Sequence, residues 1–356
     1  MQSAKARQIR SFKRMADTVL EKMGIAADCE ISPQLGRNLS AIIRPTDGEP
    51  LFVKIIGGLE AEERFDRSVS FFNSADDVPV GVHTPRLLES DRANCAVVYQ
   101  VIDDATKMSN VVTDDDVSLS TWESIGAELA ALHSWVPQRL KDIDTAQPSL
   151  PPPADTAFSL DFYESASAGQ LELFLILQSD EVLRQAITDL LSRPFTAMPI
   201  HGDLRTDQIL KQDETLWIID WEDFRLGDPA RDLGSLIGEI FFHHMRPLLK
   251  RANGKDGVTP QTMQTVGIEL IENAKPTISA IWNGYQHNCG LDDAELTALL
   301  DRVLGFVGWQ MFDRSLSIGG FLGQISGFEK ALVGMGRQML IHRGGYATAL
   351  GMGVTA

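Results

Sequence analysis

The chain has 356 residues, of which 44% are hydrophobic and 23% charged, which fits a globular protein with room for two lobes. Its formal net charge of −17 opposes binding to nucleic acid phosphates and favours cationic partners. No apolar run reaches the roughly 18–20 residues of a membrane helix, and three widely spaced cysteines are typical of reduced thiols. We therefore expect a cytoplasmic protein with neither nucleic acid nor membrane partners; the sequence indicates no oligomeric state.

The first hundred residues are predicted to contain mainly short strands. Apolar residues between Ile9 and Met23 recur at helical spacing and predict an amphipathic helix, for which a packed position is favoured over a membrane surface or a partner. Turn-forming residues at 45–50 separate two apolar segments and predict a hairpin. The predicted elements, in order, are a helix at 9–23, strands at 40–44 and 51–56, a helix at 58–74, and strands at 86–89 and 95–102.

The remainder of the chain is predicted to be mainly helical. Polar, turn-rich residues at 103–116 predict a connection, and helical patterns dominate from Trp122 onward, except for strand character near 215–220. A small β-rich unit followed by a larger helical unit is typical of an α+β protein. The order predicts two lobes, an N-lobe over 1–102 and a C-lobe over 103–356.

The segment His201-Gly-Asp-Leu-Arg-Thr-Asp-Gln208 carries the clearest chemistry. It places Asp203 and Gln208 in a loop, and Asp220 follows at the end of an apolar strand. A carboxylate at a strand end, with a nearby side-chain carbonyl, provides the hard oxygen ligands that magnesium prefers. A second carboxylate that stays off the metal can accept a proton from an attacking hydroxyl. The pattern indicates a metal-assisted reaction with one carboxylate as the base.

A helix is predicted to begin at Asp228-Pro229, because Asp caps helices and Pro favours their first turn. Apolar residues at helical spacing define its buried face, namely Leu233, Leu236, Ile237, Ile240 and Phe241.

Together with Asp-Trp-Glu at 220–222 and Gly-Asp-Pro-x-x-Asp-Leu at 227–233, these motifs resemble those of the aminoglycoside phosphotransferase (APH) family of kinase-like enzymes. The resemblance implies a protein-kinase-like bilobal fold, with a small β-rich N-lobe and a larger, mainly helical C-lobe. It also implies ATP or GTP as the phosphoryl donor and Mg²⁺ as the metal. By the same resemblance, Asp203 is the catalytic base, Asp220 binds the metal and Asp232 braces the catalytic loop.

The sequence departs from the family at Gln208, where the family has an asparagine that helps to bind magnesium. Glutamine offers the same carbonyl on a longer arm, which leaves ligation of a second magnesium open. Arg205 is predicted to steady the transferring phosphoryl group, with a surface arginine as the alternative. Glu222 and Asp223 either support the metal ligand or are solvated loop carboxylates. His201 and His133 are expected to have structural rather than catalytic roles.

The N-terminal motifs are weaker but agree with the resemblance. Residues at 35–40 match the family's loop over the phosphates, with Gly36, Asn38 and Ser40 as the candidates for nucleotide contact. Lys54 matches the lysine that pairs with the nucleotide phosphates.

Two further nucleotide contacts are predicted around that lysine. Its expected partner is Glu62, which lies at helical spacing from Phe65 and the apolar residues that follow it. The hinge is expected near 99–102, where the backbone of Gln100 and Ile102 would hold the adenine ring.

The predicted reaction moves the γ-phosphoryl group of ATP to an alcohol. Three alternatives remain open: a small cationic acceptor such as an aminoglycoside-like antibiotic, a Ser or Thr of a ribosomally made precursor peptide, or nucleotide binding without turnover by a pseudokinase. The first would confer antibiotic resistance and the second would serve peptide biosynthesis. Acidic candidates for a cationic acceptor on the C-terminal helices are Glu269, Glu272, Asp292, Asp293 and Glu295.

Overall fold

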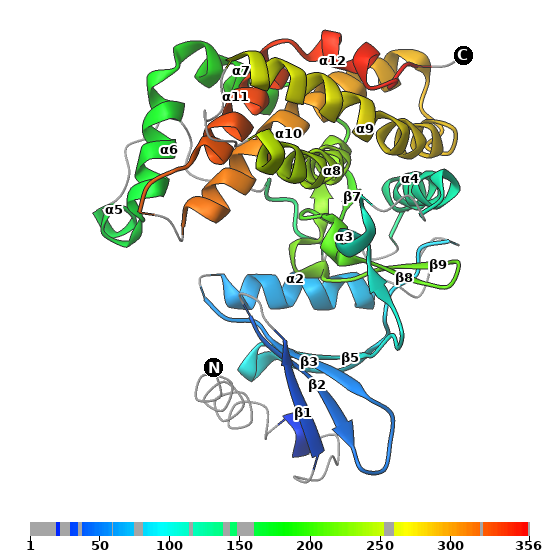
Figure 1. Ribbon diagram of the computed structural model, residues 1–356. Helices are drawn as coiled ribbons and strands as arrows, with labels where there is room; N and C mark the ends of the chain where they lie inside the picture. The colour runs from blue at the N-terminus through cyan, green and yellow to red at the C-terminus, as the bar shows by residue number, and fades with distance from the viewer. Residues whose placement is uncertain are drawn as a thin grey trace. The chain divides into compact units, whose positions relative to one another are not determined.

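The computed structural model of the chain contains a sheet of antiparallel strands near its N-terminus and a group of helices toward its C-terminus (Figure 1). None of the described helices is long and apolar enough to cross a membrane. The residues that the structure describes are 19–21, 29–34, 38–58, 60–74, 81–113, 117–137, 143–147, 160–252, 260–320 and 323–354.

The chain divides by its internal contacts into two compact units. Unit 1 comprises Met1–Thr106, Val136–Asp144 and Gln208–Arg225, and unit 2 comprises Lys107–Trp135, Thr145–Asp207 and Leu226–Ala356. The predicted boundary after residue 102 differs from this division, because two later segments group with the N-terminal sheet in the structure. The reason is packing: the strand-rich segment that contains Asp220 contacts the N-terminal sheet and its helix.

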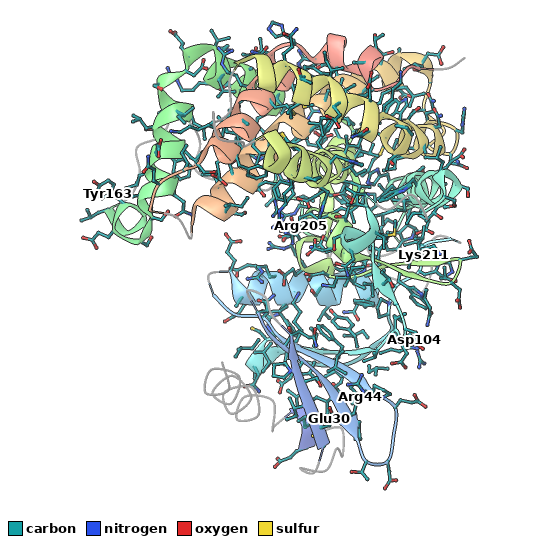
Figure 2. The ribbon with its side chains drawn as sticks, viewed as in Figure 1. Glu30, Arg44, Asp104, Tyr163, Arg205 and Lys211 are labelled. Atoms are coloured by element: carbon teal, nitrogen blue, oxygen red, sulfur yellow. The ribbon has the colours of Figure 1, made fainter. Side chains whose placement is uncertain are left out.

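Unit 1 is built on a five-stranded antiparallel sheet with the order β1-β2-β3-β5-β4. The predicted hairpin forms, with Ala41 opposite Val53 in the β2–β3 register. Glu30 and Arg44 are register partners on β1 and β2 (Figure 2), an opposite-charge pair that suits exposed positions. The strands are β1 (Cys29–Gln34), β2 (Leu39–Pro45), β3 (Leu51–Ile55), β4 (Leu87–Asp91) and β5 (Ala96–Gln100).

Alternation along the strands gives the sheet two buried faces. Val53 and Ile55 face a core that includes Val19 and Leu20, two described residues of the predicted N-terminal helix; most of that helix lies outside the described residues. Because side chains alternate along a strand, Lys54 lies on the opposite face. Its register partners there are Ser40 and Val97.

Helix α2 (Ala61–Asn73) covers the face that carries Lys54, through a cluster of Phe65 with Ile56 and Val97. At the end of α2, Phe71 stacks on Trp221, with ring centroids 3.6 Å apart. This contact attaches the segment 208–225 to α2. The segment begins at the last residue of η4 (Thr206–Gln208) and contains β8 (Ile209–Gln212), β9 (Thr215–Ile218) and η5 (Trp221–Asp223).

Unit 2 is predominantly helical, and its longest helices pack side by side, α8 and α11 both against α10 and α9 against α4 (Figure 1). The predicted helix start at Asp228 is confirmed: its carboxylate accepts a hydrogen bond of 3.1 Å from the Ala230 amide, and the five predicted apolar residues are fully buried. The long helices are α4 (Leu119–Ser134), α8 (Pro229–Ala252), α9 (Pro260–Gln286), α10 (Asp293–Gly319) and α11 (Gly327–Ile341).

Helices α4 and α9 touch backbone to backbone at a pair of glycines. A Cβ on Gly126 would lie 2.0 Å from the Ile281 carbonyl oxygen, and a Cβ on Gly284 would lie 1.9 Å from that of Glu123. No larger residue fits at this crossing, which fixes the position of α4. The shorter elements of the chain are β6 (Thr106–Lys107), α3 (Met108–Val111), α5 (Leu160–Ser165), α6 (Ala168–Ser179), α7 (Glu181–Ser192), β7 (Met198–Ile200), η2 (Arg92–Asn94), β10 (Arg225–Gly227) and α12 (Arg343–Ala349).

Candidate active site

Lys54 meets two carboxylates of the Asp-Trp-Glu motif within unit 1. Its ammonium group forms an ion pair with Asp220 and a second one, at 3.0 Å, with Glu222. Burial would lower the pKa of Lys54, but the charges of Asp220 and Glu222 raise it above its ordinary value. Lys54 is therefore held as a cation beside the predicted metal ligand.

Asp220 has an unusual backbone conformation directly after β9. Its φ of 74° and ψ of 56° lie in the left-handed region, which a non-glycine residue enters at an energetic cost. The conformation directs the chain from the strand into η5 and leaves 30% of the Asp220 side chain exposed. A partly exposed carboxylate on a strained turn is typical of a functional position.

The oxygen ligands that the protein offers around Asp220 fit a magnesium ion that is bound mainly by the phosphate oxygens of a substrate. Proteins usually bind Mg²⁺ through one or two carboxylates together with substrate phosphates. Among the described residues, no cluster of three or more His, Cys, Asp or Glu could enclose a metal alone. Asp220 is the accessible candidate ligand, whereas Gln208 is 3% exposed, and its main-chain carbonyl accepts a hydrogen bond from the Ile219 amide at 3.0 Å.

The predicted pairing of Lys54 with Glu62 is wrong. The Glu62 side chain is 74% exposed, and its nearest cation is Arg92, at 3.8 Å. Buried positions on α2 include Arg64, Ser68 and Phe71, so Glu62 lies on the opposite side of the helix. Of the apolar residues used to choose it, Phe65 is buried, whereas Val69 and Phe72 are only partly buried at the edge of the buried face.

Glu222 takes the place expected for Glu62. Burial alone would raise its pKa, but the charges of Lys54 and Arg64 lower the pKa to about 2. One carboxylate oxygen accepts from Arg64 at 2.9 Å and the other from Asn38 at 3.0 Å. The sequence offered one signal for this role, the position of Glu222 two residues after Asp220.

The candidates for the phosphate loop are placed as follows. Gly36 lies outside the described residues. Ser40 lies opposite Lys54 in the β2–β3 register. Asn38 is 9% exposed, and its side chain contacts Glu222, Arg64 and the Gly57 amide. This side chain therefore holds protein groups together, which differs from the predicted contact with nucleotide.

The predicted hinge follows β5. The Gln100 amide donates to the Arg86 carbonyl at 3.0 Å, and its side chain accepts from the Arg86 guanidinium at 3.2 Å. Because the Gln100 amide already has an acceptor, it is not available to an adenine ring. Ile102 is half-buried just beyond the strand and stays the candidate hinge residue.

In unit 2 the backbone before Asp203 is clamped by Asp232. The amides of His201 and Gly202 donate to the two carboxylate oxygens of Asp232 at 2.7 and 2.9 Å. Gly202 has a φ of 87°, a conformation that glycine enters freely, and the Asp203 side chain beyond it is 44% exposed. These contacts agree with the bracing role inferred for Asp232.

Asp232 is itself supported from behind. His133 Nε2 lies 3.3 Å from an Asp232 carboxylate oxygen, and His133 Nδ1 lies 3.0 Å from the Tyr285 hydroxyl. Burial would raise the pKa of Asp232, but the hydrogen bond from His133 contributes most to holding it below its ordinary value. His133 is 2% exposed and His201 fully buried, as expected for structural histidines.

Arg205 lies among carboxylates on the same loop (Figure 2). Its guanidinium is 3.4 Å from Asp203 and 3.7 Å from Asp207. Burial would lower its pKa, but the charges of Asp203, Asp207, Glu239 and Asp313 raise it. Arg205 is therefore a fixed cation at the predicted base.

Two of the acidic residues predicted to face a cationic acceptor have a structural role instead. Asp292 and Glu295 form the capping box that begins α10, with hydrogen bonds of 2.9 Å in both directions. Asp293 lies exposed in the first turn of the same helix.

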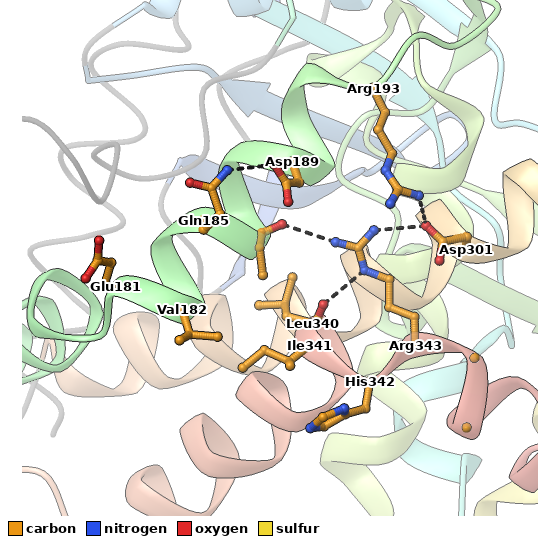
Figure 3. A pocket seen from close by; sticks show the side chains of 13 residues that line it. Glu181, Val182, Gln185, Asp189, Arg193, Asp301, Leu340, Ile341, His342 and Arg343 are labelled. Carbon is orange, nitrogen blue, oxygen red and sulfur yellow. Dashed lines mark hydrogen bonds and ion pairs between the residues drawn. The ribbon is translucent and has the colours of Figure 1, made fainter.

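A cleft of about 890 Å³ lies elsewhere in unit 2, between α7, α11 and α12 (Figure 3). Three of its charged lining groups, Asp301, Arg343 and Arg193, pair with one another. Asp301 accepts from Arg343 at 3.0 Å and also pairs with Arg193, while the Asp189 carboxylate accepts from Gln185 at 2.8 Å. The contacts of Asp301, on α10, with Arg343 and Arg193 stabilise the packing of the helices at the cleft, whereas the contact between Gln185 and Asp189 lies within α7.

Comparison with known proteins supports the fold. No curated protein matches the chain. Among solved structures, amicoumacin kinase hAmiN in complex with AMP-PNP, Ca²⁺ and Ami is 12% identical, with a TM-score of 0.53 over 94% of this chain and 96% of that one. The ADP-bound aminoglycoside phosphotransferase APH(2'')-Ib is 14% identical, with a TM-score of 0.53 over 92% and 99%. Both show the predicted kinase-like fold.

The comparison with protein families covers the candidate residues of both units. Residues 36–263 match the family described as "Phosphotransferase enzyme family" (APH), a segment that contains Lys54, Asp203, Asp220 and Asp232. The chain therefore belongs to the phosphotransferase enzyme family.

Proposed function

We propose that this protein transfers the γ-phosphoryl group of ATP to a hydroxyl of a small, cationic molecule, with Mg²⁺ as the metal. The observation that carries the proposal is the contact of Lys54 with Asp220. A strand lysine, 166 positions away in the chain, reaches the carboxylate of the Asp-Trp-Glu motif, which lies in the segment that matches the family and for which the resemblance implies a role in phosphoryl transfer. A lysine and a metal-binding carboxylate are the two groups that such enzymes use for nucleotide phosphates.

On the acceptor side, Asp203 is the proposed base. It would accept the proton of the attacking hydroxyl while a bond forms from that oxygen to the γ-phosphorus. The bond from phosphorus to the β–γ bridging oxygen breaks, ADP leaves, and Asp203 returns the proton to water. When bound, Mg²⁺ would neutralise phosphate charge, with Asp220 as its ligand and Gln208 as a secondary candidate. Arg205 would steady the transferring group.

A cationic acceptor is supported by the charges around the loop. Four carboxylates act on Arg205, and two of them, Asp203 and Asp207, have side chains 44% and 43% exposed. An excess of negative charge beside the base attracts an amine-bearing alcohol. The structurally similar hAmiN is described with AMP-PNP and Ami bound, and APH(2'')-Ib is described as an aminoglycoside phosphotransferase.

The test is a screen for one added phosphate by mass spectrometry. The protein is incubated with ATP and Mg²⁺ and with two panels, amino-alcohol antibiotics and Ser/Thr peptides. We expect phosphorylation in the first panel. Phosphorylation of peptides alone would replace the small molecule with a peptide acceptor. Nucleotide binding with neither product nor slow ATP hydrolysis would contradict the enzyme and leave a pseudokinase.

A further inference from the structure

A closed ring of hydrogen bonds lies behind Lys54. Arg64 Nη2 donates to a Glu222 carboxylate oxygen and to Asn38 Oδ1, both at 2.9 Å. Asn38 Nδ2 donates to the second Glu222 oxygen at 3.0 Å, which closes the ring. Lys54 contacts this second oxygen, also at 3.0 Å. Because both Glu222 oxygens are engaged, the carboxylate cannot rotate without losing a hydrogen bond.

The same ring fixes the end of the strand that carries Lys54. Arg64 Nη1 donates to the Gly57 carbonyl at 3.0 Å, and the Gly57 amide donates to Asn38 at 3.3 Å. Arg64 therefore holds both the carboxylate partner of Lys54 and the backbone three residues after it. Arg64 is 4% exposed, so its action on a ligand has to pass through these neighbours.

The charges of Lys54 and its neighbours determine how strongly this part of the protein attracts phosphate. Two cations, Lys54 and Arg64, face two carboxylates, Asp220 and Glu222. Arg64 shares the negative charge of Glu222, so Glu222 does not neutralise Lys54 completely. If a metal engages Asp220, the other three side chains carry one net positive charge.

We propose that Arg64 is a positioning residue for Lys54. By holding the Glu222 carboxylate in place, Arg64 keeps the Lys54 ammonium directed at the nucleotide phosphates. By partly neutralising that carboxylate, Arg64 also keeps the ammonium attractive to them. This inference rests on the proposed function, because it requires that Lys54 binds ATP. The sequence predicts an acidic residue of α2 that pairs with Lys54 directly, whereas in the structure a basic residue of α2 supports Lys54 through Glu222.

The experiment measures binding of ATP and of adenosine by calorimetry, without Mg²⁺, at constant ionic strength. Arg64→Gln is expected to weaken ATP binding roughly tenfold, the size of one charge-assisted hydrogen bond, and to leave adenosine binding within about twofold of wild type. Adenosine lacks the phosphates, so it reports whether the nucleoside site is intact. Arg64→Lys keeps the charge and is expected to recover most of the ATP affinity.

A double-mutant cycle tests whether Arg64 acts through Lys54. Lys54→Ala should weaken ATP binding, and adding Arg64→Gln to it should have little further effect. An additive loss would show an independent action of Arg64 and would overturn the proposal. If Arg64→Gln does not fold, Arg64→Lys carries the cycle, with a smaller loss of ATP affinity expected.

Arg67→Gln is the matched control. Arg67 is 7% exposed on the same helix, but it donates at 2.9 Å to the Glu222 main-chain carbonyl rather than to the carboxylate. We expect its replacement to lower thermal stability without the selective loss of ATP affinity. Equal effects of both variants, or a parallel loss of ATP and adenosine in Arg64→Gln, would overturn the proposal. Wild-type protein that binds no ATP would reject the proposed function, and the inference with it.

Discussion

The two units hold the carboxylates proposed for phosphoryl transfer by different kinds of contact. In unit 1, Asp220 and Glu222 are held by the cations Lys54 and Arg64. In unit 2, the chain before Asp203 is held by backbone amides that donate to Asp232. The four charged side chains of unit 1 change their interactions when an ion or a phosphate group binds, because the added charge competes for the same partners. A clamp built from amides keeps its geometry whatever binds nearby. We therefore expect the charged group of unit 1 to respond to nucleotide and the clamp of unit 2 to keep the proposed base in place.

The largest effect is expected at the base itself. Asp203→Asn keeps the shape of the loop but removes the proton acceptor, so turnover should fall on the order of 10²–10⁴-fold while ATP affinity stays near wild type. Steady-state kinetics and calorimetry measure the two quantities. Asp207→Asn is the matched control, since Asp207 is similarly exposed beside Arg205, and it should retain most of the turnover. Near-normal turnover in Asp203→Asn would reject the assignment of the base.

Removal of the clamp should disturb both stability and catalysis. Asp232→Ala leaves two buried amides and His133 without their acceptor, so the free energy of unfolding should fall by roughly 2–4 kcal/mol. The base would also lose its fixed backbone, so kcat should decline more than ATP affinity. Urea unfolding and kinetics provide the readouts. Asp189→Ala, at an exposed position on α7, should change neither. An unchanged kcat in a folded Asp232→Ala variant would contradict the clamp.

Acid should weaken unit 1 through Glu222. Its pKa is about 2 in the folded protein against an ordinary value of 4.5, so its contribution to stability is present above about pH 4.5 and is lost as the pH falls toward 2. Glu222→Gln lacks this ionisation. We expect a lower melting temperature than wild type at pH 7 and a smaller loss on going from pH 5 to pH 3. Parallel melting curves for the two proteins across this range would show that Glu222 is not held as a charged group.

The smallest effect is expected at Glu128 in unit 2, where a rise in pH, rather than a fall, lowers the stability of the protein. Burial raises the pKa of Glu128, on α4, from 4.5 to about 8. Stability from this group is therefore full below about pH 4.5 and is lost as the pH rises through 8. Glu128→Gln should raise the melting temperature by roughly 2–4 °C at pH 8.5 and by less at pH 5. Glu123→Gln, at an exposed position of the same helix, should show no such pH dependence.

The sequence was most informative where function depends on local spacing. The loop at Asp203, the position of Asp220 after its strand and the helix start at Asp228 each involve neighbouring residues, and all three form as the motif indicates. The predicted hairpin between β2 and β3 belongs to the same class, because turn residues and alternation determine it locally.

The side chains that contact Lys54 and Glu222 are determined by tertiary packing instead. Arg64 and Asn38 reach Glu222 from 158 and 184 positions away, contacts that no local pattern specifies. The choice between Glu62 and Glu222 for Lys54 was decided by the rotation of α2 about its axis. That rotation follows from which side chains bury best against the sheet and Trp221, a property of the whole packed unit.

The amino-acid sequence by itself determined the family, the order of a strand-rich part before a helical part, and the carboxylates proposed for phosphoryl transfer, because each follows from residue types at short, fixed spacings. Tertiary structure alone decided that a buried arginine and a loop glutamate, rather than a helix glutamate, support Lys54. Charges removed from water need partners at hydrogen-bonding distance, and only the folded chain brings those partners together.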